Sequence, residues 1–127
     1  MSQMIKDIAA HLAKQRQRSV RGSGCVYRTG YTGKMCAVGC LIPDELYTLR
    51  MEGRGVRIML DEFPEVATHI RERYSDVKPH HLVPILVAAQ EFHDSGEYSL
   101  TLKSLAALPD DELAEVIEHK IEYMVEH

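Results

Sequence analysis

The sequence contains no tryptophan and only two phenylalanines, and it lacks any long apolar run. The longest such run, residues 82–89, falls far short of the ~20 apolar residues that a membrane-spanning helix needs. Lys6 and Asp7 interrupt the apolar pattern near the N-terminus, where a signal peptide would need an apolar core. These absences predict a cytoplasmic protein with no membrane association.

Cysteine is also scarce: Cys25, Cys36 and Cys40 are the three present. An odd number argues against a disulfide framework, and free thiols are typical of the cytoplasm. Hydrophobic residues make up 45% of the chain and charged residues 27%, as in ordinary globular proteins. A length of 127 residues is typical of one domain, so we expect residues 1–127 to form a single domain.

The net charge of −4 conceals an unequal distribution. Residues 1–60 contain ten Lys and Arg against four Asp and Glu, whereas residues 61–127 contain five against fifteen. Such a division can indicate a basic face for nucleic acid. The plainer interpretation is that two solvated surfaces carry opposite charge.

Apolar residues recur at helical spacing over much of the chain. The segments expected to be helical are 2–12, 56–63, 64–74, 80–94, 99–108 and 109–124. Ser2 is a candidate N-cap, and Pro64 is suited to the first position of its helix. Pro84 is expected in the first turn, where proline is tolerated, and Gly96 is expected to stop the helix before it.

One stretch favours β-structure. Residues 24–29 and 34–42 read as two short strands, joined by a turn at Gly30 and Gly33. The expected fold is therefore α+β: a mostly helical single domain of five or six helices around one two-stranded antiparallel hairpin.

The cysteines permit a zinc site, because Cys36 and Cys40 are closely spaced and Cys25 could join them across the hairpin. His93 is the best-placed fourth ligand. Against this, strand positions four apart are separated by about 13 Å, too far for one ion unless the chain bends. The alternative is that the thiols are structural, because cysteine is among the most buried residue types.

Cys36 or Cys40 beside His93 would form a thiolate–imidazole pair, the arrangement that activates cysteine enzymes. Asp94 is not expected to orient His93, because adjacent side chains on a helix diverge by about 100°. Neither a catalytic nor a metal site is therefore assigned, and these residues remain candidates.

Nucleic-acid binding is a further alternative. The basic residues that could contact phosphates are Arg16, Arg18, Arg21, Arg28 and Lys34, with Tyr27 or Tyr31 to stack on a base. The sequence pI of about 5.9 opposes this interpretation, because nucleic-acid-binding domains are usually basic.

Several short motifs resemble a family of small uncharacterised proteins from tailed phages and prophages. They are Cys25-Val26-Tyr27-Arg28, Cys36-Ala37-Val38-Gly39, Ile42-Pro43-Asp44-Glu45, Met51-Glu52-Gly53 and Gln90-Glu91-Phe92-His93-Asp94. The resemblance covers about residues 1–96. It implies a phage setting, in which small proteins often bind and block a host factor, and it implies that the hairpin cysteines meet His93 in space.

The leading hypothesis is a phage-derived accessory protein that binds and modulates a host protein without catalysis. The contact would be made by the hairpin edge or by the acidic C-terminal helix. The alternatives are an enzyme that uses Cys36 and His93, a zinc-stabilised module, and a nucleic-acid-binding module. No cofactor other than zinc is suggested.

Overall fold

The computed structural model describes residues 2–21, 24–30 and 33–126. Its α-helices are α1 (Gln3–Gln15), α2 (Val56–Glu62), α3 (Pro64–Arg73), α4 (Pro79–Asp94), α5 (Gly96–Ser104) and α6 (Asp110–Glu126), and its 3-10 helices are η1 (Gly39–Leu41) and η2 (Leu49–Met51). Strands β1 (Val20–Arg21) and β2 (Gly24–Cys25) form one antiparallel sheet. The expected fold class, mostly helical α+β with one two-stranded sheet, is confirmed.

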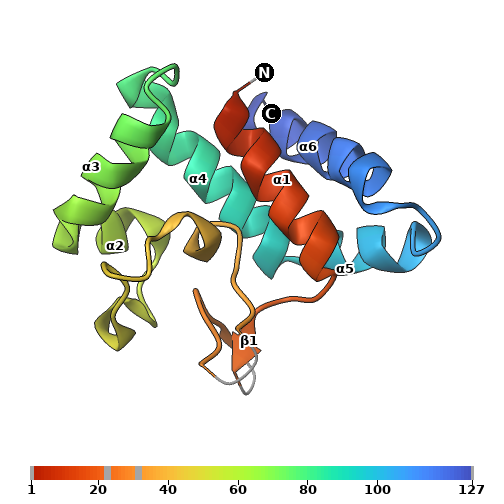
Figure 1. Ribbon diagram of the computed structural model, residues 1–127, viewed down its shortest axis with the longest axis horizontal. Helices are drawn as coiled ribbons and strands as arrows, with labels where there is room; N and C mark the ends of the chain where they lie inside the picture. The colour runs from red at the N-terminus through yellow and green to blue at the C-terminus, as the bar shows by residue number, and fades with distance from the viewer. Residues whose placement is uncertain (1, 22–23, 31–32, 127) are drawn as a thin grey trace.

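The core lies between α1, α4 and α6. Helix α6 packs against both α1 and α4, while α2 packs against α4 and α3 packs against α2 (Figure 1). Each of the three central helices contributes an apolar stripe at helical spacing. The fully buried members of these stripes are Met4, Ile8 and Leu12 of α1, Leu86, Ala89 and Phe92 of α4, and Leu113, Ile117 and Ile121 of α6.

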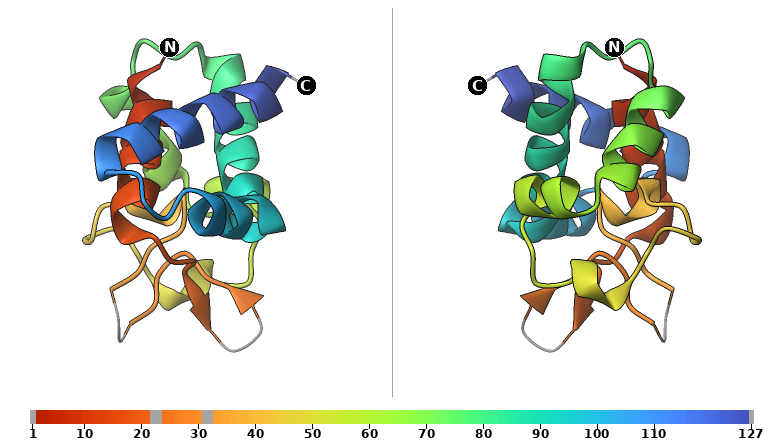
Figure 2. Two further views of the ribbon diagram at one scale, coloured as in Figure 1. Left: turned by 90° about the vertical axis from the view of Figure 1, so that its right-hand side faces the viewer. Right: turned by 90° about the vertical axis from the view of Figure 1, so that its left-hand side faces the viewer.

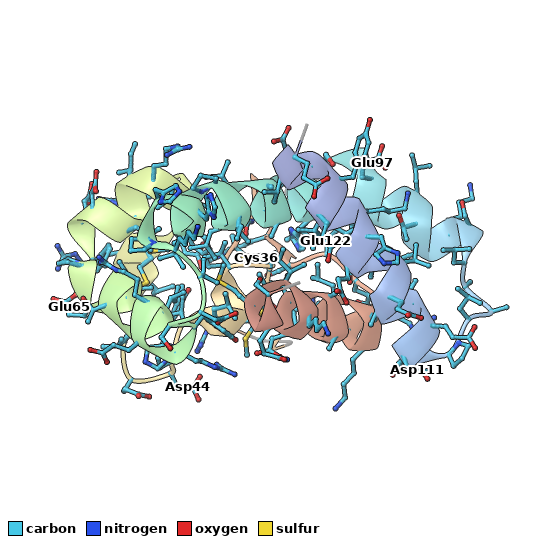
Figure 3. All side chains as sticks on the ribbon, turned by 90° about the horizontal axis from the view of Figure 1, so that it is seen from above. Cys36, Asp44, Glu65, Glu97, Asp111 and Glu122 are labelled. Carbon is cyan, nitrogen blue, oxygen red and sulfur yellow. The ribbon has the colours of Figure 1, made fainter. Side chains whose placement is uncertain are left out.

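The sheet and the loops around it form a separate layer at one end of the helices. Figure 2 shows β1 and β2 below the helical layer from both sides, away from α6. Seen from above in Figure 3, Cys36 lies in the interior, and Asp44, Glu65 and Asp111 lie near the outline of the molecule. Within the described ranges, no helix has both the length and the apolar character needed to cross a membrane.

Helix α1 has a defined beginning and end. The Ser2 hydroxyl accepts the Ile5 N–H at 3.3 Å, so the expected N-cap is confirmed. The helix ends at Gln15, and the next residue, Arg16, caps it with a left-handed backbone (φ 54°) and an N–H that donates to the Leu12 carbonyl. The Arg16 guanidinium donates to the Leu108 carbonyl at 2.6 Å and pairs with Asp110 at 2.9 Å. Arg16 thereby joins the end of α1 to the beginning of α6.

Two proline and glycine expectations change in the structure. Pro64 begins α3 as predicted, but α4 begins at Pro79, which places Pro84 in the second turn instead of the first. Helix α4 ends at Asp94, yet Gly96 begins α5 and does not stop α4. Ser95 is the single residue between the two helices. Its hydroxyl accepts the Glu97 N–H, so this serine is the N-cap of α5.

The strands are shorter than predicted and pair differently. Residues 20–21 pair with 24–25, and within the described residues the predicted strands at 24–29 and 34–42 share one isolated β-bridge, between Arg28 and Met35. The prediction of a continuous strand over 34–42 is wrong, because the chain turns at residues 37–38 and enters η1.

Gly39 explains this turn. A Cβ atom at this position would lie 2.1 Å from the Tyr27 carbonyl oxygen, far inside contact distance. Only glycine therefore lets η1 lie directly against the backbone of Tyr27, whose carbonyl oxygen also accepts the Cys36 N–H at 3.1 Å.

We expect Gly39→Ala to lower the free energy of unfolding by roughly 1–3 kcal/mol, the usual cost of forcing extra atoms into a packed interior. Urea denaturation measures the change. Gly96→Ala is the matched control, because a Cβ there meets nothing within 4 Å and the residue begins a helix. An equal loss in both variants would contradict the close-approach explanation.

Candidate functional site

Glu52 organises the loop layer. Its carboxylate accepts the backbone N–H groups of Tyr27 at 2.9 Å and Arg28 at 3.1 Å, and the Tyr47 hydroxyl at 2.6 Å. The Arg28 guanidinium pairs with Asp44 at 2.7 Å and also donates to the Ile42 carbonyl. These bonds connect residues 27–28 with the segment 42–52 that follows η1.

The loop layer is joined to α4 at His93, which is fully buried. The His93 Nε2 atom accepts the Ser19 backbone N–H at 3.0 Å, and Nδ1 lies 2.7 Å from Asp94 Oδ1. Gln90, one turn earlier on α4, donates to the same Asp94 oxygen at 2.9 Å. A backbone N–H can only donate, so Nε2 carries no proton, and the ring is held as the neutral form with its proton on Nδ1.

Cys25 completes this cluster from β2. Its sulfur, a His93 ring nitrogen and an Asp94 oxygen lie within 4.8 Å of one another. Burial raises the pKa of the Cys25 thiol, and the Asp94 carboxylate raises it further. Burial alone would also raise the pKa of Asp94, but hydrogen bonds from His93, Gln90 and Cys25 outweigh it and leave that pKa lowered.

The contact between His93 and Asp94 corrects one expectation. Their adjacency on a helix was expected to keep them apart, yet the two side chains meet at the last residue of α4. The Tyr98 ring stacks on the imidazole with ring centroids 5.6 Å apart, and its hydroxyl donates to the Leu12 carbonyl at 2.7 Å. The sequence analysis gave no role to Ser19 or Tyr98, and no local pattern marks either of them.

Cys36 and Cys40 do not belong to this cluster. The Cys36 sulfur accepts the Gly39 N–H at 3.1 Å, and complete burial raises the pKa of this thiol far above its usual range. The Cys40 thiol donates to the Ala37 carbonyl at 3.1 Å, and burial raises its pKa to about 12. Both thiols stay protonated near neutral pH, whereas nucleophilic attack requires a thiolate.

The hydrogen bonds of the cluster decide whether it can bind a metal ion. Among the described residues, Cys25, His93 and Asp94 are three side chains of metal-binding types that lie close together. In the arrangement observed, neither His93 nitrogen offers a free lone pair, because Nε2 accepts from Ser19 and Nδ1 holds the proton. The cluster is therefore suited to holding Ser19 and β2 on α4.

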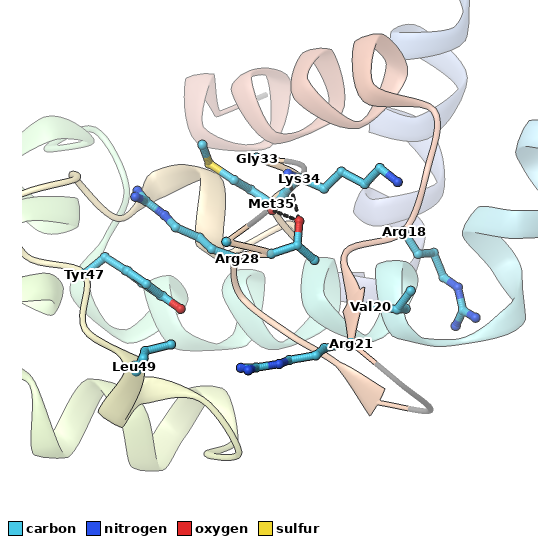
Figure 4. Close-up of a pocket in the computed structure, with 11 residues that line it drawn as sticks. Arg18, Val20, Arg21, Arg28, Gly33, Lys34, Met35, Tyr47 and Leu49 are labelled. Atoms are coloured by element: carbon cyan, nitrogen blue, oxygen red, sulfur yellow. Dashed lines mark hydrogen bonds between the residues drawn. The ribbon is translucent and has the colours of Figure 1, made fainter.

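A basic groove of about 690 Å³ lies beside this cluster. Its cationic lining residues are Arg18, Arg21, Arg28 and Lys34, and its larger apolar lining residues are Val20, Met35, Tyr47 and Leu49. Among the described residues, no acidic side chain lines it. The lining comes from β1 and the nearby Arg18, from residues 28–30 and 33–35 and from the segment 47–49, and Figure 4 shows the Arg21 side chain extending toward Tyr47 and Leu49.

Four of the five predicted phosphate-contacting residues thus share one groove. The exception is Arg16, whose guanidinium instead bonds to the Asp110 carboxylate and to the Leu108 carbonyl between α5 and α6. Tyr27, expected to stack on a base, is buried and donates its hydroxyl to the Arg54 carbonyl at 2.7 Å. Tyr31 lies outside the described residues. Tyr47 and Leu49, which the sequence analysis missed, complete the lining.

Comparison with models of protein families, with curated proteins and with solved structures finds no match for this chain. The geometry described above is therefore the basis for assigning a function.

We expect His93→Ala to lower the free energy of unfolding by more than about 2 kcal/mol. The substitution leaves the buried Ser19 N–H without an acceptor and opens a cavity beside Tyr98. His119→Ala, on the exposed face of α6, is the control and should change stability by less than about 0.5 kcal/mol.

The same measurement separates a hydrogen-bonded cluster from a zinc site. With both His93 nitrogens engaged, the melting temperature of the wild-type protein should not change when a strong chelator is added. A clear fall on chelation would contradict this account and indicate a metal bound by Cys25, His93 and Asp94.

Proposed function

We propose that this protein is a non-catalytic binding protein, and that its partner is another protein that places an acidic segment in the basic groove. The observation that carries the proposal is the groove itself, which has four cationic residues and no acidic one. The phage-family resemblance and the free thiols support a phage-derived accessory protein that engages a host protein in the bacterial cytoplasm.

The cations of the groove are available to a partner. Arg28 is paired with Asp44, but no ion pair within the described residues involves Arg18, Arg21 or Lys34. The contacts of Arg18 with other described residues are long, to the Cys25 sulfur at 3.8 Å and to the Asp94 carbonyl at 3.5 Å. Carboxylates from a partner would neutralise this local charge and guide the encounter.

A side-chain groove is a better contact surface than the edge of the sheet. Each strand contains two residues, so a third strand would find few backbone groups to pair with. The cysteine chemistry also supports binding over catalysis, since Cys36 and Cys40 are held as thiols and both nitrogens of His93 are bonded elsewhere.

Nucleic acid is the second candidate, favoured by the four cations in one groove. The remainder of the molecule opposes it, because the net charge is −4 and α6 presents a row of exposed carboxylates. These are Asp110, Asp111, Glu112, Glu115 and Glu126. A long polyanion would meet this repulsion beyond the groove, whereas a short acidic segment would not.

The test is fluorescence anisotropy with a labelled glutamate-rich peptide. We expect the double variant R21E/K34E to weaken binding by at least about tenfold, since two attractive contacts become repulsive. The control is R57E/K103E, which makes the same charge change at exposed positions on α2 and α5. Affinity should also fall as salt is raised.

Two results would contradict the proposal. One is a glutamate-rich peptide that does not bind the wild-type protein at low salt. The other is an equal loss of affinity in R21E/K34E and R57E/K103E, which would mean that the peptide responds to net charge instead of to the groove.

A further inference from the structure

We infer that the groove recognises a segment that carries both acidic and apolar side chains, instead of a segment that is acidic throughout. This inference rests on the proposed function and specifies the chemistry of the partner at the same site. It follows from the two kinds of side chain that line the groove and from the way the fold fixes each of them.

The first kind is the unpaired cations. Arg18 and Arg21 flank Ser19 and Val20, so their positions depend on the bond from the Ser19 N–H to His93. Lys34 is placed by its own backbone, whose N–H donates to the Thr29 hydroxyl at 3.0 Å and whose carbonyl accepts the Thr29 N–H at 2.9 Å. The cations are thus presented from two separate segments and can meet carboxylates that are spaced apart.

The second kind is exposed apolar surface. Leu49 is 70% exposed and Val20 is 39% exposed, and both line the groove. Leu49 begins η2, whose last residue, Met51, is fully buried. In a 3-10 helix, residues two apart point in different directions, so burial of Met51 holds Leu49 outward. A partner that carried only carboxylates would leave this apolar surface exposed to water.

One of the four cations of the groove, Arg28, is already paired within the protein. The Arg28 guanidinium is neutralised by Asp44 at 2.7 Å and lies 4.9 Å from the centre of the Tyr47 ring. Tyr47 also donates its hydroxyl to Glu52. The free positive charge therefore lies with Arg18, Arg21 and Lys34, and the surface among them is apolar.

The size of the groove fits a short segment. Its volume of about 690 Å³ lies within the range of about 300–1,000 Å³ that is typical of small-ligand pockets. Single-stranded nucleic acid fits this lining less well, because bases stack on open aromatic faces and Arg28 already lies over one face of Tyr47.

The experiment measures the affinity of the full protein for three labelled peptides of equal length by fluorescence anisotropy, with a labelled oligouridylate as a fourth probe. The first peptide alternates Glu with Leu, the second alternates Glu with Ser, and the third alternates Gln with Leu. We expect the first to bind at least about tenfold more tightly than either of the others, since each of the others lacks one kind of contact.

Leu49→Ser is the test variant, and Leu100→Ser is its matched control. Leu100 is 59% exposed on α5 and does not line the groove. Leu49→Ser should weaken binding of the Glu–Leu peptide several-fold and leave binding of the Glu–Ser peptide within about twofold, because it removes only apolar contact. Leu100→Ser should change neither affinity.

The outcomes separate the inference from the function on which it rests. If the Glu–Ser peptide binds as tightly as the Glu–Leu peptide, the inference is wrong and the proposed function stands. If neither acidic peptide binds, or if the oligouridylate binds more tightly than both, the proposed function fails as well. Equal effects of Leu49→Ser and Leu100→Ser would also overturn the inference.

Discussion

The loop layer of this protein depends on one buried hydrogen bond, from the Ser19 backbone N–H to Nε2 of His93. His93 is fully buried on the last turn of α4, so its two polar nitrogens require partners. Asp94 satisfies Nδ1, and Ser19 satisfies Nε2. Because Ser19 lies between Arg18 and Val20, the bond that satisfies a buried imidazole also positions one wall of the basic groove.

Several residues of the short sequence motifs have structural roles in this layer. Glu52 holds the backbone of residues 27–28, Gly39 permits the close contact with Tyr27, and Gln90 supports Asp94 while also accepting the Val38 N–H at 3.2 Å. These roles explain why motif residues far apart in the chain form one connected network. In the structure, these motif residues attach the loop layer to α4.

The uneven distribution of charge along the chain becomes a separation in space. Four of the ten basic residues of the first half line the groove in the loop layer, and seven of the fifteen acidic residues of the second half lie on α6 in the other layer. Arg16 is the point of contact between the two, because it ends α1 and pairs with Asp110 at the start of α6. The groove is therefore a local basic site on an acidic protein.

The sequence alone predicted the helices, because the apolar spacing, the Ser2 cap and the position of Pro64 act within a few residues. It also singled out four basic residues that share the groove, and it singled out Cys25 and His93, which the structure brings together. It could not predict that Asp94 and Ser19, and not Cys36, bond to His93, nor that residues 34–42 turn away from a strand. Those outcomes depend on how segments far apart in the chain pack together, such as Gly39 against Tyr27, and local residue patterns do not contain that information.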